Sequence, residues 1–246
     1  MKPRTALITG ANGGVGRSLC HTFRGRGWRV IATDIVESVD FQTSLYLPMD
    51  LNRIATDDEY CKNRIESLLD VLRDGLDCLV NNAAYQVVAP IEELSVSDWH
   101  KAFNTNVTSA FLLVRELLGP LRSSRGSVVN IASIHAQLTK PNFTAYAASK
   151  AALEGLTRAL AVEIGDRVRV NAIVPAAVST PMLAAGFDDS ESGLAILGRY
   201  HPSNCIGEPV DVAKMAYFLA DSDSRFLNGS VIGLDGGIAS RLHDPD

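Results

Sequence analysis

Short apolar segments alternate with longer amphipathic segments along nearly the whole chain, and this alternation limits the possible folds most. Apolar segments of this length that are continuously hydrophobic are typical of parallel strands buried on both faces of a sheet. The intervening segments have helical character, which is the pattern of βαβ units. We predict strands within 5–9, 28–34, 44–50, 77–83, 127–133, 167–175 and 230–237, and helices at 14–27, up to about 72, after 97, around 146 and from about 209. The predicted fold is a doubly wound α/β domain: about seven parallel strands with right-handed crossovers and helices on both faces.

Composition is compatible with one domain that spans residues 1–246. A chain of 246 residues with 46% hydrophobic residues can build a core on both faces of a sheet. The formal net charge is only −5, without a basic stripe, so nucleic acid and anionic membranes are disfavoured as partners and a small molecule is favoured.

The cysteines indicate a reducing compartment and no metal site. Cys20, Cys61, Cys78 and Cys205 are scattered, with neither a CxxC pair nor histidines at zinc-ligand spacing. The segment after Met1 lacks the apolar core of a signal peptide, and no apolar run is long enough to cross a bilayer. We therefore expect a cytoplasmic protein.

Residues 176–207 interrupt the alternation, because glycines and prolines separate apolar patches that have no clear period. Long connections in compact domains are usually functional or disordered. We interpret this segment as a substrate lid, with an inconsequential surface insertion as the alternative.

A glycine-rich turn follows the first predicted strand and opens directly into a helix. In this context glycines allow a tight turn and a close approach to a pyrophosphate, which the N–H groups of the helix N-terminus can bind. The turn predicts a dinucleotide site that includes Gly10, Asn12, Gly13, Gly14, Val15 and Gly16.

Asp34 ends the second strand, 18 residues after Gly16, close to the spacing of a carboxylate that binds the adenosine ribose. A 2′-phosphate would meet a like charge there, and neither Gly13 nor Ile35 offers a cation. NAD is therefore favoured over NADP. Arg17 is the nearest cation, and the sequence does not place its side chain. The alternative for Asp34 is a turn or helix cap.

Asp50 ends the third strand and could accept from the adenine amino group, with Leu51 packing nearby. A helix or turn cap is an equally open interpretation of Asp50.

Tyr146 and Lys150 are four residues apart, so on a helix they share one face. A tyrosine pKa of about 10 must fall by roughly three units for acid–base work near neutrality. A cation about 4 Å away at an effective dielectric of about 20 supplies roughly 4 kcal/mol, which is enough before desolvation. A solvated surface pair is the alternative. Ser133 lies 13 residues before Tyr146 and could share a bound carbonyl.

Together the glycine turn, Asp34, the run 81–84, Asn106, Ser133, YxxxK and the closing LDGG make the chain resemble the short-chain dehydrogenase/reductase family. The resemblance extends from Thr5 to Gly237. It implies an NAD-dependent oxidoreductase that interconverts a secondary alcohol and a ketone.

The resemblance also implies residue roles. Tyr146 would be the general acid–base group, Lys150 would lower its pKa and hold the nicotinamide ribose, and Ser133 would hydrogen-bond the substrate oxygen. Asn106 would hold a water in a proton relay to Lys150, the alternative being an asparagine at a helix kink. The remaining residues would line the coenzyme path: Asn82, Ala83, Ala84, Pro175, Val178 and, at the carboxamide, Thr180.

Two positions depart from the family pattern, since Ala84 and Ala176 stand where glycine is usual. Alanine tolerates positive φ only at a cost. Either these turns avoid positive φ or they have shifted, which leaves the nicotinamide contacts open.

The residues expected to face the substrate are mostly polar: Tyr85, Gln86, His135, Gln137, Asn142 and the lid, with Ser133, His135 and Tyr146 in direct contact. This polarity favours a sugar, polyol or hydroxy acid. His135 as a surface residue and a hydrophobic ketone or steroid-like alcohol are the alternatives. A non-catalytic dinucleotide-binding regulator, or a lyase or epimerase with bound NAD, is less favoured because all four catalytic residues are present and a second domain has no room.

Apolar faces on two predicted helices include Phe111, Leu112, Leu117 and Leu118, and Leu153, Leu156, Leu160 and Ile164. Such faces usually belong to the core. In the resembled family these helices meet symmetry mates, so a homotetramer or homodimer is expected.

Overall fold

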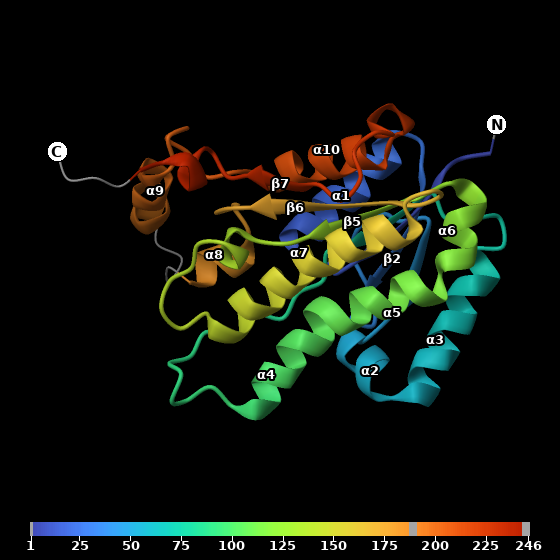
Figure 1. Ribbon diagram of the computed structural model, residues 1–246, viewed down its shortest axis with the longest axis horizontal. Helices are drawn as coiled ribbons and strands as arrows, with labels where there is room; N and C mark the ends of the chain where they lie inside the picture. Colours follow the sequence, from blue (N-terminus) through green and yellow to red (C-terminus); the bar gives the residue numbers. More distant parts are fainter. Residues whose placement is uncertain (1, 187–190, 243–246) are drawn as a thin grey trace.

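Seven strands form one parallel sheet in the computed structural model, which describes residues 2–186 and 191–242 (Figure 1). Their order across the sheet is β3-β2-β1-β4-β5-β6-β7. The strands are β1 Thr5–Thr9, β2 Arg29–Asp34, β3 Leu45–Pro48, β4 Cys78–Asn81, β5 Ser127–Ile131, β6 Arg169–Pro175 and β7 Val231–Leu234. The chain runs outward from β1 to β3 and then restarts at β4 on the other side of β1. This reversal leaves a crevice at the carboxyl ends of β1 and β4, where ligands bind in such sheets.

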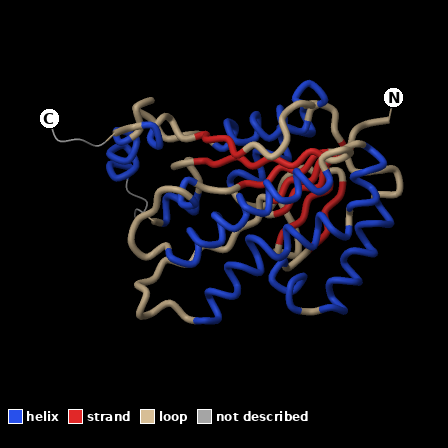
Figure 2. Tube along the Cα trace, in the orientation of Figure 1, coloured by secondary structure: helices blue, strands red, loops and turns tan. Residues whose placement is uncertain are grey.

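Helices cover both faces of the sheet, as predicted (Figure 2). Both faces of the sheet are apolar. Alternate residues of β1 point to opposite sides, so Leu7 packs in one core cluster and Ile8 in the other. The first cluster includes residues of α3, α5, α6 and α7, and the second those of α1 and α10. The two-sided burial explains why the strands are continuously hydrophobic.

Two of the predicted helices are interrupted in the structure at positions that the sequence did not indicate. The helix predicted up to about residue 72 is two helices, separated where the Asp57 carboxylate accepts from the Tyr60 N–H at 2.9 Å. The long helix after Ser97 is interrupted by a π-helical turn at Asn104–Thr108. The helices are α1 Gly14–Gly25, α2 Leu51–Thr56, α3 Asp58–Val71, α4 Val96–Phe103, α5 Ser109–Glu116, α6 Leu118–Ser124, α7 Thr144–Ile164, α8 Pro181–Ala185, α9 Glu191–Tyr200 and α10 Pro209–Ala220.

The segment 176–207 is more regular than its sequence indicated, because it contains α8 and α9. Thr180 caps α8 by accepting from the Leu183 N–H at 3.2 Å, and Pro181 occupies the first turn. Residues 187–190 of the segment lie outside the described residues. The sequence did not indicate α8 and α9, because helices of 5 and 10 residues give little periodic signal.

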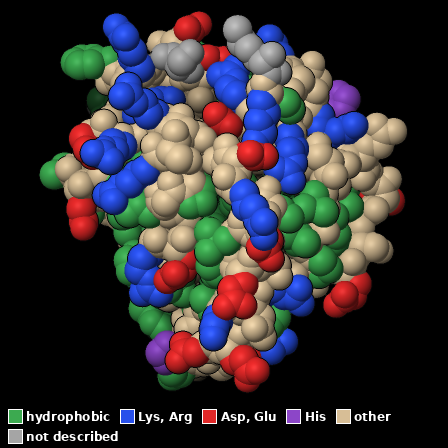
Figure 3. Space-filling view, turned by 90° about the vertical axis from the view of Figure 1, so that its right-hand side faces the viewer, with side chains coloured by type: hydrophobic (Ala, Val, Ile, Leu, Met, Phe, Trp, Pro, Cys, Tyr) green, Lys and Arg blue, Asp and Glu red, His purple; other side chains and the backbone are tan. Residues whose placement is uncertain are grey.

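Lysine and arginine side chains are interspersed with aspartate and glutamate on the face shown in Figure 3. This is the side of the molecule away from the carboxyl ends of β6 and β7 (Figure 1). No helix in the described ranges is long and apolar enough to cross a membrane.

Candidate active site

A cavity of about 1040 Å³ lies at the carboxyl ends of the strands, bordered on one side by the turn between β1 and α1. Gly10 has a φ of +63°, and a Cβ there would stand 2.6 Å from the Ala83 Cα. A Cβ on Gly16 would stand 2.0 Å from the Gly10 carbonyl oxygen. Gly13 precedes α1 without a side-chain cap, so the N–H groups of the first helical turn are available to an anion. The predicted turn residues Gly10, Asn12, Gly13, Gly14, Val15 and Gly16 all line the cavity.

Asp34 lies at the adjoining corner and presents its carboxylate to the same cavity. One oxygen accepts from the Asn12 N–H and the other from the Ile35 N–H, both at 2.8 Å. These contacts fix the orientation of the carboxylate at the edge of the cavity.

The structure places the Arg17 side chain, which the sequence could not. Its guanidinium donates to the Asn12 carbonyl at 2.9 Å and to the Asn12 side-chain oxygen at 2.6 Å. It also pairs with Asp40 at 2.7 Å and lies over the Phe41 ring. The charge of Arg17 is therefore engaged by Asp40.

Asp50 caps α2 by accepting from the Asn52 N–H at 2.9 Å and the Arg53 N–H at 3.3 Å. The cap interpretation of Asp50 is thus observed. Both Asp50 and the buried Leu51 also line the cavity.

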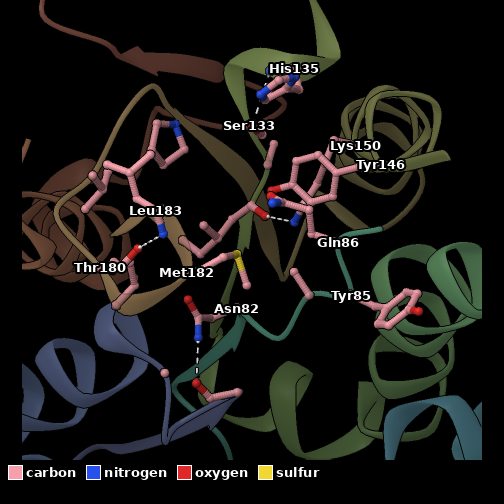
Figure 4. A pocket seen from close by; sticks show the side chains of 18 of the residues that line it. Asn82, Tyr85, Gln86, Ser133, His135, Tyr146, Lys150, Thr180, Met182 and Leu183 are labelled. Atoms are coloured by element: carbon pink, nitrogen blue, oxygen red, sulfur yellow. Dashed lines mark hydrogen bonds between the residues drawn. The ribbon is translucent and has the colours of Figure 1, made fainter. Parts of the chain in front are cut away.

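The chain that leaves β4 forms the floor of the cavity, between the glycine turn on one side and Asp34 and Asp50 on the other. Asn82, labelled in Figure 4, has a side-chain amide that donates to the carbonyls of Thr9 and Gly10 at 2.9 and 3.0 Å. The Thr9 hydroxyl accepts from the Asn82 and Ala83 N–H groups. Asn82, Ala83 and Ala84, which were predicted to line the coenzyme path, line the cavity.

Tyr146 and Lys150 project from α7 toward Ser133 at the end of β5, and all three are buried (Figure 4). The Lys150 ammonium donates to the Ile131 carbonyl at 2.7 Å and lies 5.6 Å from the centroid of the Tyr146 ring. The Ser133 hydroxyl accepts from the His135 N–H at 3.2 Å. The three groups predicted to share a carbonyl thus come together.

Burial has the largest effect on the pKa values of Tyr146 and Lys150. It raises the pKa of the Tyr146 phenol, an effect that the hydrogen bond with Ser133 opposes. It also lowers the pKa of Lys150 to about 8. We expected Lys150 to lower the pKa of Tyr146. The pKa of Tyr146 is instead raised, because desolvation is the largest effect on both groups.

Asn106 lies in the π-helical turn and is almost fully buried. Its side-chain oxygen accepts from the Tyr85 N–H at 2.7 Å, and its amide donates to the Tyr85 carbonyl at 3.0 Å and the Ser149 hydroxyl at 2.9 Å. Asn106 therefore fixes the loop after β4 against α7.

His135 lines the cavity beside Tyr146 and is not a freely exposed loop residue. Its ring stacks on Phe143 with centroids 4.3 Å apart, and its Nδ1 lies 2.9 Å from the Thr139 hydroxyl. Burial and the nearby Lys140 lower the pKa of the imidazole.

Other residues expected at the substrate have different orientations. Tyr85 and Gln86 line the cavity, but the Tyr85 hydroxyl donates to Asp98 at 2.7 Å. Gln137 donates to the Glu154 carboxylate at 3.2 Å, so its amide is directed at α7. Asn142 adopts a positive φ of 74° in the turn before α7. Neither Gln137 nor Asn142 lines the cavity.

The chain after β6 forms the opposite wall, where Pro175, Val178 and Thr180 line the cavity. The backbone of Val178 forms a bridge to that of Gly207. Neither Ala84 nor Ala176 is among the described residues with positive φ. The two departures from the usual glycines therefore cause no left-handed strain.

Sequence reasoning did not name the individual apolar residues of the cavity wall or one histidine, although four of them lie in the segment 176–207 that was expected to face the substrate. The apolar side chains are those of Leu138, Phe143, Met182, Leu183, Leu197 and Ile238, and the histidine is His201. Phe143 could have been found from its position three residues before Tyr146, whereas His201 offered no motif. In the described ranges, no group of three or more His, Cys, Asp or Glu residues could hold a metal.

Comparison with known proteins gives matches over nearly the whole chain. Residues 10–239 match a family model described as enoyl-(acyl carrier protein) reductase. A 3beta-hydroxysteroid dehydrogenase 1 from Eggerthella lenta is 31% identical, over 97% of this chain and 94% of that protein.

Two solved structures are similar in fold. A putative NAD(P)-dependent gluconate 5-dehydrogenase from Beutenbergia cavernae, with bound NADP at low occupancy, is 32% identical with a TM-score of 0.87, covering 97% of each chain. A 4-hydroxyisoleucine dehydrogenase complexed with NADH is 29% identical with a TM-score of 0.86, covering 97% of this chain and 100% of that one.

Proposed function

Since the chain belongs to the short-chain dehydrogenase/reductase family and is an oxidoreductase, we propose that it interconverts a secondary alcohol and a ketone with NAD. The observation that carries this proposal is the grouping of Ser133, Tyr146 and Lys150 in one buried corner of the cavity. The glycine turn supports a dinucleotide beside them, because it borders the cavity and leaves the N–H groups that begin α1 without a side-chain cap, available to a pyrophosphate. Bound nicotinamide would supply the hydride acceptor or donor.

The protein groups move the proton and hold the reacting oxygen. Tyr146 exchanges a proton with that oxygen, and Ser133 hydrogen-bonds it and stabilises the charge that develops there. Lys150 would hold the nicotinamide ribose, and its positive charge would favour the ionised phenol against the desolvation that raises the pKa of Tyr146. Asn106, which is buried in the π-helical turn between α4 and α5, is also proposed to take part in the proton relay to Lys150.

NAD is the proposed coenzyme, with NADP disfavoured by the carboxylate of Asp34. The cation that could offset this carboxylate, Arg17, is paired with Asp40. One similar structure contains NADP and another contains NADH, so the comparisons favour neither coenzyme. The proposed preference for NAD therefore rests on Asp34 and Arg17. Calorimetry should give tighter binding of NADH than of NADPH, and the reverse order would remove the basis of the preference.

The proposed substrate is a polar, hydroxylated small molecule such as a sugar, polyol or hydroxy acid. Gln86 and His135 at the cavity support this class, as does the similarity to a gluconate 5-dehydrogenase. A second candidate is a hydrophobic cyclic alcohol, favoured by Leu138, Met182 and Leu183 in the wall and by the hydroxysteroid dehydrogenase relative.

The segment 176–207 is proposed as the substrate lid, because Met182, Leu183 and Leu197 of α8 and α9 line the cavity. We also propose a homotetramer or homodimer in the cytoplasm. Support for self-association comes from Phe111 on α5 and Val162 on α7, which are 40% and 88% exposed. Sedimentation as a monomer of 26.4 kDa would refute it.

The test is an NAD-reduction screen over polyols, sugars, hydroxy acids, cyclic alcohols and steroids. Tyr146→Phe should abolish turnover of any substrate found while NADH affinity changes little. Tyr217→Phe, at a partly buried tyrosine of α10 that packs against the core on the opposite face of the sheet, is the matched control and should retain turnover. Full activity of Tyr146→Phe would overturn the mechanism, and turnover of steroids without any hydroxylated compound would select the second candidate.

A further inference from the structure

Arg17, near the start of α1, is held on the glycine turn by contacts at every nitrogen of its guanidinium. Nε donates to the Asn12 carbonyl at 2.9 Å, and one terminal nitrogen donates to the Asn12 side-chain oxygen at 2.6 Å. The other terminal nitrogen pairs with the Asp40 carboxylate at 2.7 Å. Asn12 lines the cavity and Arg17 does not. The guanidinium is therefore directed at the connection between β2 and β3, where Asp40 lies, and not at the coenzyme cavity.

The same contacts bring Arg17 close to the corner occupied by Asp34. The Asn12 N–H donates to the Asp34 carboxylate at 2.8 Å, so Asn12 bonds to both Asp34 and Arg17. A phosphate beside Asp34 would thus lie one residue away from the guanidinium. The Arg17 side chain is 42% exposed, and its planar group matches the geometry of phosphate oxygens. If released, Arg17 is suited to pair with such a phosphate.

The cations that line the cavity belong to other parts of it. Asp34 ends β2, and β1 separates β2 from β4 in the sheet. The lining cations follow β4, β5 or β7 in the chain: Lys101, Lys140, Lys150 and Arg241. Lys101 lies over the ring of Tyr85, and Lys150 lies beside Tyr146. Arg17 is therefore the cation through which this corner can change its charge.

We propose that Asp40 sets coenzyme specificity through Arg17. By holding the guanidinium away from the cavity and neutralising its charge, Asp40 denies a 2′-phosphate the cation that it needs beside Asp34. This inference rests on the proposed function and adds a positioning residue, distant from the ribose, to the carboxylate of Asp34. The hydroxyls of an unphosphorylated ribose need no cation, so the binding of NAD does not depend on Asp40.

The exposure of Asp40 makes this role testable without unfolding the protein. Its side chain is 76% exposed, and ion pairs between exposed groups contribute little to stability. Asp40→Asn keeps the size of the side chain and removes its charge, which releases Arg17. The effect is clearest together with Asp34→Ser, where the direct repulsion of a 2′-phosphate is removed.

The test measures Kd for NADH and NADPH by fluorescence titration. In the Asp34→Ser background, Asp40→Asn should lower Kd for NADPH by about tenfold, the effect of one charge-assisted contact. Kd for NADH should change little. Adding Arg17→Gln to this double variant should abolish the gain for NADPH. Asp70→Asn is the matched control, because it removes the same charge from an exposed pair with Arg73 on α3 and should leave both affinities unchanged.

Two outcomes would overturn the role of Asp40. One is an unchanged Kd for NADPH on adding Asp40→Asn, and the other is a gain that persists with Arg17→Gln or equally accompanies Asp70→Asn. If the Asp34→Ser variants do not fold, Asp40→Asn alone decides. It should then bind adenosine 2′,5′-bisphosphate more tightly than the wild type does, with 5′-AMP affinity unchanged, and equal affinities for both would overturn the proposal.

The proposed function fails by different results. Tighter binding of NADPH than of NADH by the wild type would overturn the proposed coenzyme, and turnover that survives Tyr146→Phe would overturn the mechanism. Neither result depends on Asp40, because the role of Asp40 is measured as a change between variants that differ at Asp40 and Arg17.

Discussion

The Lys150 ammonium donates to the backbone carbonyl of Ile131 across 2.7 Å, which ties α7 to the last residue of β5. This contact is buried, and it holds the cation where it faces the coenzyme cavity beside Tyr146. The same burial disfavours the charged form of Lys150, so a lysine at this position lowers the stability of the folded protein.

Lys150→Met should change the pH dependence of stability. Because burial lowers the folded-state pKa of Lys150 from 10.5 to about 8, the unfolded chain binds more protons between these values. The contribution of Lys150 to stability therefore rises with pH in this window. The free energy of unfolding of the wild type, relative to Lys150→Met, should increase by roughly 2 kcal/mol from pH 7 to pH 9.5.

Urea denaturation at the two pH values measures this difference. The raised pKa of Tyr146 acts with the opposite sign, since stability is lost as pH rises above 10, but it is common to both proteins. Lys214→Met, at an exposed lysine on α10, is the control. An unchanged difference between pH 7 and pH 9.5 for Lys150→Met would contradict the prediction.

Gly16→Ala should abolish dinucleotide binding and destabilise the fold. Its Cβ would lie 2.0 Å from the Gly10 carbonyl oxygen and 2.7 Å from the Ala11 Cα, and backbone atoms cannot yield cheaply. Gly25→Ala at the end of the same helix is the matched control, because a Cβ there meets nothing within 4 Å. Thermal unfolding and NADH fluorescence titration should show a loss only for Gly16→Ala. Normal NADH affinity in that variant would mean that the turn has another conformation.

Asn106→Ala should destabilise the loop after β4. It leaves the N–H and the carbonyl of Tyr85 without their partners, at a cost of about 1–3 kcal/mol for each buried group. Tyr85→Phe removes only the hydroxyl contact with Asp98 near the surface and should cost much less. Chemical denaturation gives the stabilities, and hydrogen exchange at residues 83–87 reports the loop. Equal effects of the two substitutions would argue against the role of Asn106 in holding this loop.

Ala84→Gly and Ala176→Gly should leave coenzyme affinity nearly unchanged and lower stability. Both alanines already adopt backbone conformations outside the positive-φ region, so glycine adds only freedom to the unfolded chain. The expected loss is about 0.4–1 kcal/mol for each substitution. Calorimetric titration with NADH and thermal unfolding measure the two effects. A gain in stability for either variant would show that its alanine is strained.

Much of the site was predictable because its residues belong to short motifs attached to strand ends. The turn at Gly10–Gly16 follows a strand and opens a helix, and Tyr146 and Lys150 are one helical turn apart. Local spacing of this kind determines which side chains share a face or a turn. Since all seven strands are parallel, their carboxyl ends meet at one edge and bring these motifs together.

The amino-acid sequence by itself determined the α/β class and the glycine turn and indicated Ser133, Tyr146 and Lys150 as the proposed reacting side chains, because hydrophobic periodicity and motif spacing act over a few residues. Only the tertiary structure decided which polar candidates face the cavity. Gln137 bonds to Glu154, whereas His201, hidden in a segment without a periodic signal, lines the cavity wall. Likewise, only the tertiary structure decided the pKa shifts of Tyr146 and Lys150, because desolvation depends on atoms that packing brings together from elements far apart in the sequence.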